Sequence, residues 1–221
     1  MAFDVLGTMV DEPGGLRRGI RTLAPDVGPA RAEALVARWL AYVAAEQRDM
    51  LEGRRPYAAS TVLDLEAAGL VAAEAGMQGQ EAVRDLAAAA LRLDPWPDSV
   101  SGLARLAAAY PVAGLSNANR AALTEISEHA GLRWQHTLSA EDAATYKPHP
   151  EVYRLAVAAA ACPPGEVLMV AAHAWDLRGA QAVGMRTAYV ARPVGDPPHA
   201  DDTFDFHAEG LHDLADQLGV R

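Results

Sequence analysis

The chain has 221 residues, of which 51% are hydrophobic and 22% charged, a balance typical of a folded globular protein with room for one domain and an insertion. Its formal net charge of −10 disfavours nucleic acid and anionic membrane surfaces as partners, and it requires a locally positive pocket for any anionic substrate. Cys162 is the only cysteine, so no intrachain disulfide can form. With no secretory signal and no long apolar run, the sequence predicts a cytoplasmic protein without a membrane partner.

The N-terminal segment joins a short apolar strand to a carboxylate, a glycine and a hydroxyl. Met1-Ala2-Phe3 precedes Asp4, and Gly7 and Thr8 follow at once. Because glycine permits a tight turn, we expect Asp4 at the carboxyl end of a strand, the edge at which open α/β sheets bind ligands. A polar turn without function explains this fragment equally well. Strands usually have about 5–6 residues, so we expect either a short first strand or a start further upstream.

The segment 11–95 is predicted to be helical. A long amphipathic stretch runs from Pro29 to about Leu51, and further helical stretches are expected near 60–75 and 80–91. Since no clear strand separates them, these helices are expected to form a helical cap domain inserted after the first strand. Two prolines within 94–98 mark its end.

After this boundary, short apolar runs alternate with helical segments. The expected strands are 112–115, 137–138, 167–170, 187–190 and 204–207, and the expected helices are 100–109, 120–130, 150–161, 177–183 and 211–218. This alternation predicts an α/β fold, a Rossmann-like doubly wound parallel sheet with helices on both faces. We assign residues 1–10 and 96–221 to this core domain and residues 11–95 to the cap, which would cover the carboxyl edge of the sheet.

Polar side chains follow several of the expected strands. They are Ser116-Asn117, the segment Tyr146-Lys147-Pro148, and the segment from His173 to Asp176. Each has an ordinary structural explanation, as a helix cap or a loop residue. Their joint order, each after a strand or at the start of a helix of one sheet, indicates a functional site at the carboxyl edge.

In this order the motifs resemble the haloacid dehalogenase superfamily and, more narrowly, the type II (S)-2-haloacid dehalogenases. The motifs that carry the resemblance are Phe3-Asp4-x-x-Gly7-Thr8, Leu115-Ser116-Asn117, Tyr146-Lys147-Pro148 with Glu151-Val152-Tyr153, and His173-Ala174-Trp175-Asp176. They span nearly the whole chain. The resemblance implies a metal-independent enzyme without a cofactor that hydrolyses small anionic 2-haloacids, of the haloacetate and 2-halopropionate class, to (R)-2-hydroxyacids.

The resemblance also implies the catalytic roles. Asp4 would attack the substrate and form an ester on the enzyme. Lys147 would lie beside Asp4, hold it ionised and offset the charge of the substrate carboxylate. Ser116 and Thr8 would donate hydrogen bonds to the nucleophile or the substrate. Asp176 would orient Lys147 and position or activate the water that hydrolyses the ester.

A second set of residues would contact the substrate or the halide. Asn117 would face the leaving group, where negative charge develops. Tyr153 and Trp175 would shape the site, and His173 stands where the family often has asparagine. Leu6 would form one wall of the pocket, where the family usually has an aromatic residue.

Leu6 also separates two kinds of chemistry. Phosphatases of the superfamily resemble Asp-x-Asp, in which the second carboxylate transfers a proton to the leaving alcohol, an effect that typically contributes ~10²–10⁴-fold in rate. Leu6 cannot transfer a proton, and no second acid near Asp176 completes a set of hard ligands for Mg²⁺. Because a halide leaves without a proton, dehalogenation is favoured. A phosphatase and a catalytically weak relative that binds small carboxylates remain the alternatives.

The cap arginine that the resemblance implies for halide binding has one candidate. Arg38 is the only arginine between residues 35 and 42, and its register differs from the expected one by about one residue. A solvent-facing position is an equally good interpretation of Arg38. The family also suggests a possible homodimer.

Overall fold

The computed structural model describes residues 1–221 and contains a six-stranded sheet in the order β3-β2-β1-β4-β5-β6. Its strands, numbered in chain order, are Ala2–Phe3, Ala113–Ser116, His136–Ser139, Leu168–Ala171, Arg186–Val190 and Phe206–Ala208. All neighbouring strands are parallel, and β1 lies between β2 and β4. Since the strand order reverses its direction at β1, the carboxyl ends of β1, β2 and β4 form the switch point at which such sheets bind ligands.

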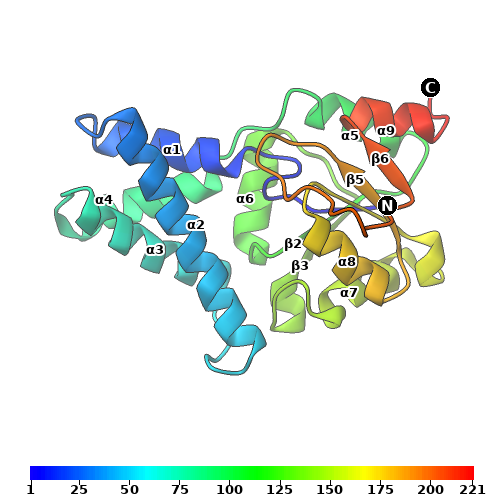
Figure 1. The fold of residues 1–221 in the computed structure, drawn as a ribbon, viewed down its shortest axis with the longest axis horizontal. Helices are drawn as coiled ribbons and strands as arrows, with labels where there is room; N and C mark the ends of the chain where they lie inside the picture. Colours follow the sequence, from blue (N-terminus) through cyan, green and yellow to red (C-terminus); the bar gives the residue numbers. More distant parts are fainter.

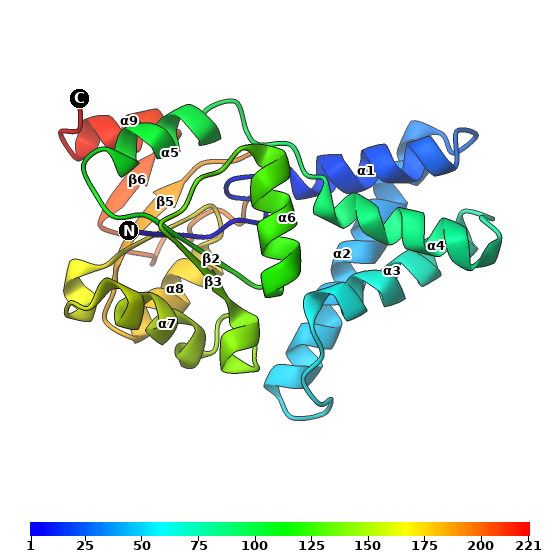
Figure 2. The ribbon, with the colours of Figure 1, turned by 180° about the vertical axis from the view of Figure 1, so that it is seen from behind.

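Helices cover both faces of this sheet, which confirms the predicted doubly wound α/β fold (Figures 1 and 2). One face packs against α5 (Ser99–Ala107), α6 (Arg120–Ala130) and α9 (Leu211–Gln217), in a core of 23 buried hydrophobic residues. The other face packs against α7 (Pro150–Ala160) and α8 (Ala174–Ala182), in a core of 16. Short 3-10 helices, η2 (Ala140–Ala143) and η3 (Pro164–Glu166), precede α7 and β4.

The last strand starts two residues later than predicted, at Phe206 rather than Phe204. The Asp205 carboxylate accepts a hydrogen bond from the Thr187 amide, at 2.8 Å, in place of a backbone carbonyl. Regular pairing with β5 therefore begins only after Asp205.

A separate helical lobe lies beside the sheet (Figure 1). It consists of α1 (Glu12–Leu23), α2 (Pro29–Leu51), α3 (Ser60–Glu74), α4 (Gly79–Ala87) and η1 (Ala88–Leu91). Twelve buried hydrophobic residues, among them Leu35 and Trp39 at helical spacing on α2, form its own core. We refer to this lobe as the cap, and the boundaries predicted for it, at 10/11 and 95/96, remain a proposal.

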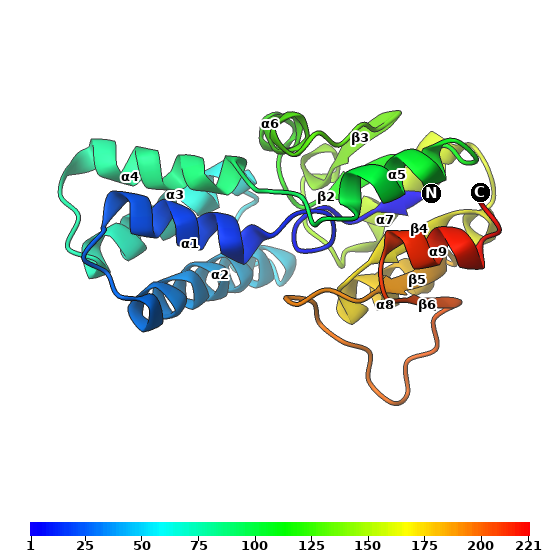
Figure 3. The same ribbon diagram turned by 90° about the horizontal axis from the view of Figure 1, so that it is seen from above.

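The chain enters and leaves the cap through one narrow neck (Figure 3). Val10 and Pro95 form an antiparallel bridge there, and the Asp11 amide donates to the Asp94 carbonyl at 2.8 Å. Because β1 leads directly into this neck, the residues after Asp4 belong to both the sheet edge and the cap connection. No helix combines the length and the apolar character needed to cross a membrane.

Candidate active site

The carboxyl ends of the central strands bring the predicted polar residues together. Asp4 follows β1, Ser116 ends β2, Lys147 lies between η2 and α7, and Asp176 lies in the first turn of α8. Parallel strands end at a common edge, which is why residues 4, 116, 147 and 176 become neighbours.

The Lys147 ammonium lies between two carboxylates. Its Nζ is 3.0 Å from Asp4 Oδ1 and 2.8 Å from Asp176 Oδ2, and its side chain is only 1% exposed. Burial acts to lower the pKa of Lys147, but Asp176 and Asp4 outweigh burial, so the pKa is raised. Burial raises the pKa of Asp176, and the Lys147 charge partly offsets that effect. The three groups form one buried charge system with a net charge of −1 when all are ionised.

Thr8 holds the other oxygen of Asp4. Its hydroxyl donates to Asp4 Oδ2 at 2.6 Å and accepts from the Ala172 amide at 2.9 Å. Both carboxylate oxygens of Asp4 therefore have a donor, as a positioned nucleophile requires. Gly7 makes the turn between them with a positive φ of 78°, and a Cβ there would lie 2.7 Å from Nε2 of His173. Only glycine fits this turn without strain.

Tyr153, on α7, contacts Asp176, one of the three buried charged groups. Its hydroxyl donates to Asp176 Oδ1 at 2.7 Å, and burial, followed by the nearby Asp176 charge, raises the pKa of Tyr153. The hydroxyl lies where a side chain on Gly179 would collide with it, so the glycine in α8 permits this contact. Tyr153 does not line the cleft, and it contacts Asp176 rather than the space above Asp4.

The loop after Asp4 is fixed through its carbonyl groups. Four successive carbonyls each face a polar side-chain group, and these groups come from three distant segments. Leu6 O faces His173 Nε2 (3.3 Å), Gly7 O faces Trp96 Nε1 (3.0 Å), Thr8 O faces Arg192 Nε (2.8 Å) and Met9 O faces Ser99 Oγ (2.7 Å). Arg192 is 6% exposed and also lies 2.8 Å from Asp98, which follows the neck. The loop after Asp4 is thus bound to the segment after the neck and to the ends of β4 and β5, which lead to His173 and Arg192.

A cleft of about 260 Å³ lies above these groups, between the core and the cap. The core lines it with Asp4, Leu6, Gly7, Asn117, Lys147, His173, Trp175 and Val194, and the cap lines it with Glu12, Pro13, Leu40, Val43, Ala44 and Gln47. The cap side is mostly apolar. Leu6 lies in the wall of the cleft and has no group that can transfer a proton.

Asn117 connects the two sides of the cleft. Its Oδ1 accepts from the Lys147 amide at 2.9 Å, and its Nδ2 donates to Gln47 Oε1 on α2 at 3.2 Å. His173 stacks on Trp175 with ring centroids 5.9 Å apart. Ser116 is fully buried, and its hydroxyl accepts from the Ala118 amide at 3.1 Å, so it supports the strand end rather than lining the cleft.

Arg38 does not reach the cleft, contrary to its predicted place as the halide-binding cap arginine. Its Nε lies 3.2 Å from Glu74 Oε1, and its side chain is 48% exposed. The residues of α2 that line the cleft lie at positions 40, 43, 44 and 47, which is one helix face. Position 38 precedes position 40 by two residues, about 200° around the helix. Arg38 therefore points away from the site.

None of the six cap residues that line the cleft was among the predicted site residues, and two of the six have polar side chains. Gln47 completes a polar contact to Asn117, and Glu12, the first residue of α1, places a second carboxyl group near Asp4. Burial raises the pKa of Glu12 to about 8, with further contributions from Asp64 and Asp4. No sequence motif marks either residue, because their positions depend on how the cap sits over the sheet.

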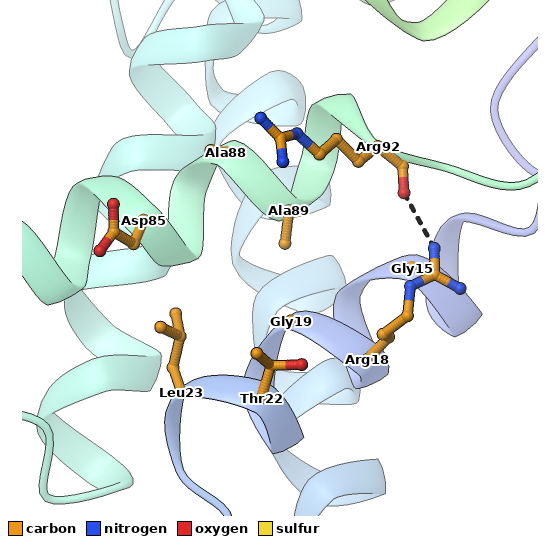
Figure 4. A pocket seen from close by; sticks show the side chains of 9 residues that line it. All are labelled: Gly15, Arg18, Gly19, Thr22, Leu23, Asp85, Ala88, Ala89 and Arg92. Carbon is orange, nitrogen blue, oxygen red and sulfur yellow. Dashed lines mark hydrogen bonds between the residues drawn. The ribbon is translucent and has the colours of Figure 1, made fainter. Parts of the chain in front are cut away.

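Two larger cavities lie away from these groups. One, of about 380 Å³, lies within the cap between α1 and η1, where Arg18 donates to the Arg92 carbonyl (Figure 4). The other, of about 580 Å³, lies at the amino end of the sheet and is lined mainly by hydrophobic residues. Neither contains a convergent set of bonded carboxylates and an ammonium, and no three His, Cys, Asp or Glu side chains are grouped to hold a metal ion.

Comparison with known proteins agrees with this geometry. The chain is 33% identical over 205 residues to an (S)-2-haloacid dehalogenase of Burkholderia cepacia, covering 89% of the chain and 84% of the relative. It is 29% identical over 200 residues to an (S)-2-haloacid dehalogenase of Pseudomonas putida, covering 87% of the chain and 85% of the relative.

Solved structures lead to the same family. A crystal structure of an L-2-haloacid dehalogenase superposes with a TM-score of 0.89 at 33% identity, over 100% of this chain and 98% of the other. The L-2-haloacid dehalogenase of Xanthobacter autotrophicus with chloropropionic acid covalently bound superposes with a TM-score of 0.84 at 26% identity, over 99% and 97%. The family model for haloacid dehalogenase-like hydrolases matches residues 1–184, and the chain therefore belongs to the haloacid dehalogenase-like hydrolase family.

Proposed function

We propose that this protein is a hydrolytic dehalogenase that converts small (S)-2-haloacids, of the haloacetate and 2-halopropionate class, to (R)-2-hydroxyacids. The observation that carries the proposal is the Lys147 ammonium held between Asp4 and Asp176 at the base of the cleft, with Leu6 in place of a second acid. The relatives named as (S)-2-haloacid dehalogenases, which match most of the chain, support the same substrate class.

In the first step, an oxygen of Asp4 attacks C2 of the substrate. The new C–O bond forms as the carbon–halogen bond breaks, and the halide leaves with the bonding electron pair, so C2 is inverted. Thr8 and Lys147 hold Asp4 in place for this attack. No proton is needed by the leaving halide, which is why an apolar Leu6 is compatible with this step. Asn117, beside the nucleophile, has an amide group that can stabilise the departing halide.

In the second step, water attacks the Asp4 carboxyl carbon of the ester. The acyl C–O bond breaks and C2 keeps its inverted configuration. One water proton ends on the product hydroxyl, and the other is released to solvent. The carboxylate of Asp4 returns with one oxygen taken from water. We assign to Asp176, which Lys147 and Tyr153 hold by both oxygens, the positioning or activation of this water.

We also propose that the enzyme works without a metal ion, that it is cytoplasmic and that it forms a homodimer. Metal independence is supported by the chemistry of a halide leaving group and by the Lys147 cation that already stands between the two carboxylates. A cytoplasmic location is supported by the single, free Cys162. A homodimer is retained from the family resemblance alone.

Halide release tests the proposal. The wild type without added metal should release chloride from (S)-2-chloropropionate, give (R)-lactate, and leave the (R) substrate unreacted, whereas Asp4→Asn should be inactive. A single turnover in ¹⁸O-water should place the label in Asp4 rather than in the product. Racemic or retained product would contradict the mechanism. If no halide is released and phosphate is freed from a generic ester only with Mg²⁺, the phosphatase is favoured. If neither halide nor phosphate is released, a catalytically weak relative that binds small carboxylates is favoured.

A further inference from the structure

The cleft has an unusual charge balance for a site that receives an anion. Its charged lining residues are Asp4, Glu12 and Lys147, and no arginine lines it. Lys147 is already shared by Asp4 and Asp176. With all four groups ionised, a substrate carboxylate would meet a net charge of −2, and a neutral Glu12 would reduce this to −1 and so weaken the repulsion.

Glu12 is the carboxyl group without a partner. It is half-buried, at the start of α1, and its side chain makes no hydrogen bond or ion pair with any other residue. The neighbouring Asp11, in contrast, caps α1 by accepting from the Gly14 amide at 2.9 Å. On the cap side, the cleft around Glu12 is lined by Leu40, Val43 and other apolar residues. A carboxyl group in such a place is more stable as the neutral acid, which can donate one hydrogen bond.

We propose that Glu12 is a specificity-determining residue that binds the substrate carboxylate as a neutral carboxylic acid, donating its O–H in a cleft that has no arginine. The proposal rests on the dehalogenase function above and deepens it. A hydrogen bond from a carboxylic acid to a carboxylate is charge-assisted and short, and a carboxylate is a strong acceptor for it. It recognises an anion without adding a cation to the site.

The groups around Glu12 set the pH range of this interaction. Burial raises the pKa of Glu12 to about 8, and the charges of Asp64, on α3, and Asp4, after β1, add to this effect. The other titratable groups that face the cleft are Lys147 and His173. Glu12 is therefore mostly protonated at pH 7. Above about pH 8, binding of an anion must take up a proton, so the affinity for the anion falls as the pH rises.

Proton uptake on binding of propionate, which has no leaving group, tests this directly. Calorimetric titrations in buffers of different ionisation enthalpy should give about one proton taken up per propionate at pH 9 and almost none at pH 6, because Glu12 is then already protonated. The isosteric Glu12→Gln should bind propionate with no uptake at either pH. Glu81→Gln, an exposed carboxyl group on α4, is the matched control and should behave as the wild type. Uptake that persists in Glu12→Gln, or is absent from the wild type, would overturn the proposal.

Kinetics give a second readout. The KM of the wild type for (S)-2-chloropropionate should rise about tenfold per pH unit above pH 8, since each unit removes about nine-tenths of the protonated acid, and the KM of Glu12→Gln should stay nearly flat. Leu40→Arg, which places a cation on the same cleft wall, should weaken the pH dependence even if Glu12→Gln folds poorly. Turnover with the same KM profile in wild type and both variants would contradict the role of Glu12. Proton uptake without turnover of any haloacid would contradict the dehalogenase function and leave the role of Glu12 standing.

Discussion

The two sides of the cleft differ in how their side chains are held. On the core side, Asp4, Lys147 and Asp176 each have bonded partners, and the loop after Asp4 is fixed by its carbonyl groups. On the cap side, apolar residues of α2 dominate, and Glu12 has no side-chain partner. The groups proposed to carry out the reaction thus lie at the well-bonded edge of the sheet. The cap provides the apolar wall of the cleft and the carboxyl group of Glu12. Changes to the core side should lower the rate of the chemical step, and changes to the cap side should change binding.

Lys147→Met should have the largest effect, because it leaves Asp4 and Asp176 as two buried carboxylates without a cation between them. Breaking a buried pair by removing one partner typically costs about 3–5 kcal/mol, and we expect halide release to fall by ~10³-fold or more as one carboxyl group takes up a proton. Urea unfolding and chloride release measure the two effects. Activity within tenfold of the wild type would show that the ammonium is not part of the chemical step.

Arg192→Met should have the next largest effect, although Arg192 touches no substrate. It removes the donor to the Thr8 carbonyl and leaves Asp98 half-buried without its ion pair. We expect kcat to fall by roughly 10–100-fold with little change in KM, because a displaced nucleophile lowers the rate more than the binding. Arg186→Met, at the start of the strand that leads to Arg192 and in an exposed pair with Asp205, is the control and should leave kcat unchanged.

A double-mutant cycle separates positioning from simple destabilisation. If Arg192 acts through Thr8, the losses in kcat for Arg192→Met and Thr8→Val should not add in the double variant. Additive losses would mean that Arg192 stabilises the neck without positioning the nucleophile.

The core side could be predicted from the sequence because its residues are fixed by strand ends. Asp4, Lys147 and Asp176 each follow a strand or start a helix of one parallel sheet, so their proximity follows from the topology. Thr8 is placed by the short turn at Gly7. The order of the motifs and the topology of the sheet therefore both place these four residues at one edge of the sheet.

The cap side could not be predicted in the same way. Arg38 was the only arginine near the place at which the resemblance implies one, but the phase of α2 turns it outward, as the alternative solvent-facing interpretation had it. Glu12 and Gln47 enter the cleft because of how α1 and α2 sit over the sheet edge, which depends on packing between two separate cores. Ser116 ends β2 at the same edge as Asp4, and its hydroxyl accepts from the Ala118 amide, so the hydrogen bond that it was predicted to donate to the nucleophile or the substrate stays a prediction.

Asp64→Asn tests how far a buried carboxyl group inside the cap destabilises the protein. Burial raises the pKa of Asp64 from 3.8 to about 6, against the hydrogen bond from Trp39 Nε1, which lowers it. A carboxyl group whose pKa is raised by folding stabilises the folded protein below the unfolded pKa, and this contribution is lost as the pH rises through about 6. Wild type and variant should be equally stable at pH 4, and the variant should be up to about 3 kcal/mol more stable above pH 7.

Urea unfolding between pH 4 and pH 8 measures this difference. Asparagine keeps an oxygen that can accept from Trp39, so the variant loses no hydrogen bond. Asp85→Asn, an exposed position on α4, is the control and should show no pH-dependent gain. A pH-independent difference for Asp64→Asn would mean that the carboxyl group is solvated in the folded protein.

Arg38→Ala should have the smallest effect, and this sharpens the contrast within the cap itself. The Arg38–Glu74 pair is exposed, and such pairs contribute about 0–1 kcal/mol in water. We expect kcat and KM to stay within about twofold of the wild type, since deletion of a surface side chain removes no contact in the cleft. A tenfold rise in KM on Arg38→Ala would mean that α2 changes its orientation when substrate binds, because position 38 lies about 140–200° around the helix from Leu40 and Val43. If kcat and KM both stay unchanged in Arg38→Ala, the outer face of α2 has only a structural role. Recognition of the anion is then left to Glu12 and the groups of the core.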